Sequence, residues 1–236
     1  TNTLLIKDGA TVDAATLGEG NAGNLTVKAA NVQVIGTSQD SQFSSTLSTQ
    51  TNMLGDGGDL VITTDILQVE DAAQVIAQSF DTGRAGNLII NADSIRLNND
   101  GLLSANTRSN KIDPQGREQA TITINSKDLI LRRSSNIFTN ATGENVVGGS
   151  ININSDVIAA LENSDISANS ANFRGGNVNI LSQGIFGTQF REQVTDFSDI
   201  TATGADSESS GSVTIDGLEQ NPAETLTQLP SVPVEG

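Results

Sequence analysis

A short aliphatic phrase recurs along the chain at nearly constant spacing, and it limits the possible folds more than any other feature. A small residue, usually glycine, opens each copy, and aliphatic residues follow two and four positions later. The seven pairs are Leu25/Val27, Leu60/Ile62, Leu88/Ile90, Ile122/Ile124, Ile151/Ile153, Val178/Ile180 and Val213/Ile215. Successive copies open 27 to 35 residues apart. Repeats of this length are typical of proteins built from one stacked supersecondary unit.

Two more apolar pairs follow in most copies, at fixed distances from the opening. One lies nine and eleven residues after it, as Val32/Val34, and one seventeen and nineteen residues after it, as Val75/Ala77. In the two longest copies the last pair comes seven residues late. These late pairs are Leu47/Thr49 and Ile200/Ala202. Alternation at period two places each pair on one face of a strand. Three short strands per copy therefore predict an all-β parallel β-helix of about seven coils.

Two other β architectures fit this pattern less well. A β-sandwich has short alternating strands, but they need not recur at fixed internal offsets. A propeller blade has four strands and usually carries aromatic signatures. This chain has no Trp and no Tyr, and its aromatic content is 3%. The narrow interior of a β-helix, in contrast, favours the small aliphatic residues that dominate here.

The repeats divide the chain into two parts. We expect residues 1–217 to form the β-helix, with an incomplete first coil and inserted loops near 36–46, 108–119 and 188–198. Residues 218–236 contain three prolines, which cannot donate to a strand ladder, and we expect a C-terminal cap or linker there.

The third inserted loop is rich in apolar residues: Phe186, Phe190, Val194 and Phe197 lie in or beside it. We expect a short amphipathic loop or helical turn that covers the wall of the helix. The alternative is an exposed apolar patch that binds a partner.

Charge and missing residue types exclude several functions. The chain has 28 acidic and 12 basic residues, a formal net charge of −16, and neither His nor Cys. It therefore lacks the residues for Ser-His-Asp or Cys-His catalysis, zinc fingers and disulfides. The negative charge argues against nucleic acid and anionic membrane surfaces as partners. No apolar run is long enough for membrane insertion.

Half of the basic residues lie within 26 positions, on an otherwise acidic chain. This cluster is a candidate contact for an anionic glycan, and the alternative is a solvated loop beside a polar turn. Its members are Arg108, Lys111, Arg117, Lys127, Arg132 and Arg133.

Catalytic, metal and cofactor sites are not predicted. The glycine-aspartate run that begins at Gly55 lacks the neighbouring copies that a calcium nonapeptide site needs, although looser calcium binding by stacked turn carboxylates stays open. Asp8, Asp71 and Glu162 occupy comparable turn positions, but in separated copies. A polysaccharide-active enzyme would need convergent carboxylates, so it ranks last among the functions considered.

Two stretches resemble a known family. The repeats GNAGNLTVKAANVQV and GRAGNLIINADSIRLNNDGLLSANT are similar to those of filamentous haemagglutinin-like exoproteins of the two-partner secretion type, particularly the cyanobacterial kind. The segment GIFGTQFREQVTDFSDITATGADSESSGSVTID, followed by NPAETLTQLP, resembles the end of their repeat region. The resemblance implies a right-handed β-helix, a secreted passenger at the cell surface, and an outer-membrane partner pore for the full-length protein.

Together these observations predict a non-enzymatic rod segment of a secreted, adhesin-like exoprotein that presents loops for adhesion. A surface glycan or protein receptor is the expected partner, and end-to-end self-association is a second kind of contact. The alternative function is a structural subunit of an extracellular filament or sheath.

Overall fold

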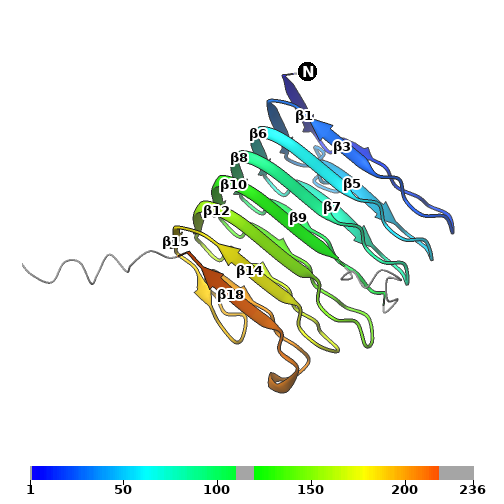
Figure 1. The fold of residues 1–236 in the computed structure, drawn as a ribbon. Coiled ribbons are helices and arrows are strands. Elements are labelled where there is room, and N and C mark those ends of the chain that lie inside the picture. The colour runs from blue at the N-terminus through cyan, green and yellow to red at the C-terminus, as the bar shows by residue number, and fades with distance from the viewer. Residues whose placement is uncertain (1, 110–119, 218–236) are drawn as a thin grey trace, which may run out of the picture.

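The computed structural model describes residues 2–109 and 120–217. Within these ranges the regular structure is β-strand, apart from a single 3-10 turn, η1 (Ser207–Ser209). The strands form two sheets in which all pairs are parallel, so the all-β, parallel architecture is confirmed (Figure 1). The expected cap at 218–236 and most of the loop near 108–119 lie outside the described residues.

The larger sheet, sheet A, stacks one strand from each repeat in sequence order (Figure 1). Its order is β1 (Thr3–Lys7), β4 (Asn31–Ile35), β6 (Leu60–Glu70), β8 (Leu88–Asn98), β10 (Thr121–Arg132), β12 (Ser150–Ala160), β14 (Asn177–Leu181) and β18 (Ser212–Asp216). Two shorter strands extend it, because β3 (Leu25–Lys28) pairs with β6 and β15 (Gly184–Phe186) pairs with β12.

The smaller sheet, sheet B, is built in the same way from the last strand of each repeat. Its order is β2 (Thr11–Asp13), β5 (Thr46–Thr51), β7 (Gln74–Ser79), β9 (Leu102–Ser104), β11 (Asn136–Phe138), β13 (Ile166–Ser167), β17 (Asp199–Thr201) and β16 (Gln189–Phe190). The chain thus passes from sheet A to sheet B once per repeat, and each strand pairs with its counterpart one repeat later. This topology is compatible with a solenoid.

The aliphatic columns pair position for position, as their spacing predicts. Ile124 lies opposite Ile90 on one side and Ile153 on the other, and Ile153 lies opposite Ile180. The late pairs of the two long repeats also fall in register, because Leu47 pairs with Val75 and Ile200 with Ile166. These side chains are buried in a single continuous core between the sheets.

The expectation of three separate strands in every repeat is wrong for β6, β8, β10 and β12, in which the first two segments form one strand of 11 or 12 residues. The physical reason is visible in β6, where Thr64 is buried and two consecutive exposed residues, Asp65 and Ile66, follow it. This pair shifts the phase of the alternation, so that the inward face turns a corner. The Thr64 hydroxyl donates to the carbonyl oxygen of Ala30 at 2.9 Å, so this buried polar group has a partner at the bend. The strand pairing of β6 continues on both sides of it.

Glycine opens most repeats because the stacked backbones leave no room for a side chain. A Cβ atom at Gly58 would lie 2.1 Å from the carbonyl oxygen of Gly23 in the preceding repeat. At Gly176 it would lie 1.9 Å from the carbonyl oxygen of Gly149. The recurring glycine is thus a packing requirement at the closest approach between repeats.

A second corner, between sheet A and sheet B, is where the loops diverge in length. Five repeats turn there through two consecutive residues with positive φ, such as Asp71 (57°) and Ala72 (62°). The two long repeats instead leave this corner through a glycine, Gly36 or Gly187, and continue into the segments 36–46 and 188–198. Both inserted loops therefore start at the same corner of the stack.

Candidate functional site

Two of the basic residues singled out from the sequence, Arg132 and Arg133, lie together where β10 ends. The Arg132 guanidinium donates to both carboxylate oxygens of Glu162, at 3.0 and 2.8 Å. The same carboxylate accepts the backbone amide of Arg133 at 3.1 Å. The hydrogen bond from Arg132 holds the pKa of Glu162 below its ordinary value and raises the pKa of Arg132. Much of the positive charge here is thus compensated within the protein.

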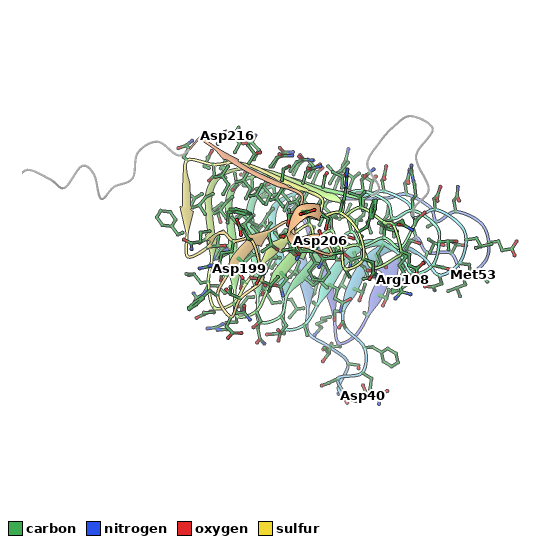
Figure 2. All side chains as sticks on the ribbon, turned by 90° about the horizontal axis from the view of Figure 1, so that it is seen from below. Asp40, Met53, Arg108, Asp199, Asp206 and Asp216 are labelled. Carbon is green, nitrogen blue, oxygen red and sulfur yellow. The ribbon has the colours of Figure 1, made fainter. Side chains whose placement is uncertain are left out.

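The other described members of the basic cluster lie elsewhere. Lys127 is at the bend of β10, where its Nζ is 3.0 Å from a carboxylate oxygen of Asp93. Arg108 is exposed beyond the far end of sheet B, next to Thr107, which bridges to Ala141 (Figure 2). Arg133 stands at the corner before β11 and the Ala141 bridge comes after β11, so Arg108 and Arg133 lie beyond opposite ends of the strands of sheet B. Lys111 and Arg117 lie outside the described residues.

The apolar side chains of the loop near 188–198 point to solvent. The expectation that they cover the wall of the stack through an amphipathic or helical turn is wrong: Phe186, Phe190, Val194 and Phe197 are all about half exposed or more, up to 67% for Phe197. The loop instead contributes β16, which pairs with β17 and extends sheet B by one strand.

A buried carboxylate holds this loop in place. Asp199 is fully buried and accepts hydrogen bonds from the Arg191 guanidinium and, at 2.5 Å, from the backbone amide of Thr195. The Arg191 guanidinium also lies 5.5 Å from the centre of the Phe197 ring, a distance that suits a cation–π contact. The Asp199 amide in turn donates to Asp165 at 2.9 Å, and burial raises the pKa of the Asp165 carboxyl.

Between this loop and the turn that follows β17 lies a hollow of about 470 Å³. Phe190 and Val194 line it from the loop, and Ala202, Asp206 and Gly211 line it from the turn. Its walls mix apolar, acidic and basic groups, and they do not converge on one chemical feature of a ligand.

The loop at 36–46 projects from the body of the molecule, with Asp40 near its tip (Figure 2). An antiparallel bridge between Thr37 and Ser44 closes its base. The Ser38 hydroxyl donates to Asp40 at 2.5 Å, which lowers the pKa of that carboxyl. Phe43 stands 64% exposed beside it. The loop is thus a small closed hairpin that displays one acidic and one aromatic side chain.

The turn carboxylates considered for catalysis are far apart and locally engaged. Asp71 accepts a hydrogen bond from Asn99 at 2.8 Å, and Glu162 binds Arg132. They follow β6 and β12, three strand spacings apart in sheet A, or about 14 Å. Paired carboxylates of glycosidases are about 5 to 10 Å apart. Across residues 2–109 and 120–217 no three acidic side chains come close enough together to bind a metal ion. Nor does this part of the chain contain a helix that could cross a membrane.

The outer face of sheet A carries a feature that the repeat analysis missed, namely rows of amide side chains. Asn125 donates from Nδ2 to Asn91 Oδ1 at 2.9 Å, and Asn179 donates to Asn152 Oδ1 at 3.0 Å. The signal was present in the sequence, because these asparagines occupy the outward positions three and five residues after the opening of a repeat. Asparagine usually indicates turns, so its place between inward aliphatic residues was overlooked.

Comparison with protein-family models, with curated proteins and with solved structures found no match for this chain.

Three described surfaces are candidates for binding. They are the projecting loop at 36–46, the apolar loop at 188–198 and the amide rows on sheet A. In the basic cluster, Lys127 and Arg132 are paired with acidic groups, Arg133 donates to Asn98 at 2.9 Å, and Lys111 and Arg117 lie outside the described residues, so the anionic-glycan contact stays a prediction.

Proposed function

We propose that the chain is a segment of a right-handed parallel β-helix, with three faces per coil and about seven coils, which serves as the rod of a secreted, cell-surface adhesin-like exoprotein. The observation that carries this proposal is the uninterrupted pairing of like strands in both sheets, from β1 to β18 and from β2 to β17. A stack of this kind is elongated and can grow by repetition without changing its cross-section.

The role of such a rod is to present side chains away from the cell. Two loops support this role, because both leave the stack at one corner and both expose aromatic side chains, Phe43 in one and Phe197 in the other. Exposed apolar groups on loops held by a rigid scaffold are frequent binding determinants. A surface glycan or a protein receptor is the proposed partner.

The proposed function is non-enzymatic and requires no cofactor. Its support is the dispersal of the turn carboxylates and the local engagement of Asp71 and Glu162. In line with the resemblance to filamentous haemagglutinin-like proteins, we place the segment near the C-terminal end of a passenger that leaves the cell through an outer-membrane partner pore.

A binding experiment tests the adhesin role. The purified chain would be applied to cell surfaces and compared with a variant in which residues 37–45 are replaced by a two-residue turn like the one at Asp71–Ala72. We expect the variant to keep its β-sheet circular dichroism and to lose adherence. Unchanged adherence would contradict the presentation of ligands by this loop. Replacement of 188–198 by a four-residue segment like residues 161–164, which also removes seven residues, would test the second loop.

The second candidate, a filament or sheath subunit, predicts a different outcome. It is favoured by β18, which pairs on one side alone within the described residues and could accept another strand on its other side. If sedimentation shows concentration-dependent polymers and the chain fails to adhere to cells, the filament role replaces the adhesin.

A further inference from the structure

The outer face of sheet A is polar, and it has no part in the loop-based adhesion proposed above. The outward residues of β10, β12 and β14 include Thr123, Asn125, Asn152, Asn154 and Asn179, whereas the inward residues that alternate with them are isoleucine or valine. The amides Asn91–Asn125 and Asn152–Asn179 are hydrogen-bonded between neighbouring strands. Each bond uses one donor and one acceptor, so every amide keeps further hydrogen-bonding capacity that faces solvent.

Two shallow hollows follow these rows across the strands. One, of about 330 Å³, is lined by residues of β6, β8 and β10, and the other, of about 230 Å³, by residues of β10, β12, β14 and β18. Asn125 lines both, so the hollows are adjacent. Together they cross six neighbouring strands, five spacings of about 4.8 Å, or about 24 Å along the stack. This is the length of an extended oligomer rather than of a single small molecule.

The lining of the hollows has little net charge. Lys127 and Asp93 both contribute to the first hollow and form an ion pair with each other. Asp216 is the remaining charged residue among those that line the two hollows. The other polar groups are amides and hydroxyls, which both donate and accept hydrogen bonds. This chemistry matches a ligand that is rich in hydroxyl groups and carries no charge.

Other classes of polymer fit less well. The net charge of −16 repels an anionic polymer, and Arg132, which could attract one, is paired with Glu162. An extended peptide binds by adding its backbone to a free sheet edge. The hollows lie over strand faces instead, and five of their six strands, β6 to β14, are paired on both sides.

We propose that the outer face of sheet A binds an extended neutral polysaccharide, whose chain runs along the stack and across the strands. The inference rests on the proposed adhesin function and names the ligand class of one of its surfaces. It moves the glycan contact from the basic cluster to the asparagine rows.

A matched pair of variants tests this inference. Asn125→Ala/Asn152→Ala/Asn179→Ala removes three amides of the hollows. Gln33→Ala/Gln68→Ala removes another inter-strand amide pair, bonded at 2.6 Å on the same sheet but outside the lining of both hollows. Both variants would first be checked by circular dichroism and thermal melting, because a change in fold would prevent the comparison. Replacing Asn by Gln at the three positions, which keeps the amides, supplies a second, more conservative variant.

The probes are hexasaccharides of β-1,4-linked glucose, xylose and mannose and of α-1,4-linked glucose, with heparin as the anionic comparator. Binding would be followed by NMR shift perturbation, which detects weak complexes. We expect at least one neutral hexasaccharide to bind. The triple alanine variant should bind it about tenfold or more weakly, and the Gln33→Ala/Gln68→Ala variant should bind it like the wild type. Heparin should bind more weakly than the neutral probe.

Three outcomes would overturn the inference: no neutral hexasaccharide binds, the triple variant binds as well as the wild type, or heparin binds best. Failure of the inference is distinguishable from failure of the proposed function. If cells still capture the triple variant but not the loop variants, the adhesin role stands and the polysaccharide face does not. If no variant and no wild-type chain adheres to cells, the adhesin role itself fails.

Discussion

At the scale of the residue, the effect of a substitution on stability depends on the direction in which the side chain points. Ile124 and Thr123 are neighbours in β10, yet Ile124 is fully buried in the core and Thr123 is partly exposed on the outer face. Ile124 lies between Ile90 and Ile153 of the neighbouring repeats, whereas Thr123 lies between Ile89 and Asn152.

Ile124→Asp and Thr123→Asp should therefore differ sharply in stability. The first buries a carboxylate without a partner and should lower the free energy of unfolding by about 4 kcal/mol or more. The second places the charge in water and should change it by less than about 0.5 kcal/mol. Thermal or denaturant melts measure both, and equal effects would show that the register of the inward face is wrong.

A second prediction at this scale concerns pH. Burial raises the pKa of Asp165 above 3.8, so its ionised form is less stable in the folded chain than in the unfolded one. The resulting penalty applies above the raised pKa and disappears as the pH falls below 3.8. Asp165→Asn, which can still accept the Asp199 amide, should thus melt higher than the wild type at pH 7. The difference should shrink toward pH 3.5, and a difference that grows on acidification would contradict this cause.

At the scale of the element, the sequence predicted which aliphatic residues pair between repeats better than it predicted where each strand begins and ends. Fixed offsets identified which residues pair, including Leu47 and Ile200 after their seven-residue delay. They did not show that β6 continues through its bend, because two consecutive outward residues interrupt period two in the same way as a turn does. Nor could the offsets show that Phe190 and Phe197 stay exposed. The conformation of their loop depends on the contact between Arg191 and the buried carboxylate of Asp199, which no repeat spacing reveals.

The loop at 188–198 should depend on that buried carboxylate. Asp199→Ala leaves the Thr195 amide and part of the Arg191 guanidinium without their acceptor, and should cost about 2 to 4 kcal/mol, less than a fully buried pair because Arg191 is partly exposed. Hydrogen exchange should accelerate across residues 189–197. Asp196→Ala, an exposed change in the same loop, serves as the control and should leave exchange unaltered.

At the scale of the whole molecule, stability comes from repetition. The core extends from Ile6 in β1 to Ile200 in β17, and partly buried Val213 and Ile215 of β18 pack against it. Because each repeat buries its aliphatic face against the next one, the stack needs no single central element.

We therefore predict that excess chelator leaves the melting temperature unchanged. Carboxylates on the surface, such as Asp59 and Asp71, are hydrogen-bonded to neighbouring repeats and do not converge on one another. Differential scanning calorimetry with EDTA and with added calcium is the measurement. A rise of several degrees with calcium would reveal an oxygen-ligand site among the turns.

The parallel pairing between repeats also has a mechanical consequence. The hydrogen bonds that join one repeat to the next point along the stack, so a force that pulls the two ends apart loads the bonds of the outermost repeat before those of the interior. Under such tension the molecule should peel one repeat at a time. Each release should lengthen the chain by the contour of 27 to 35 residues, roughly 90 to 120 Å. A force-extension trace would then show a series of small steps. A surface tether built from this stack would extend repeat by repeat under load and would not unfold in a single event.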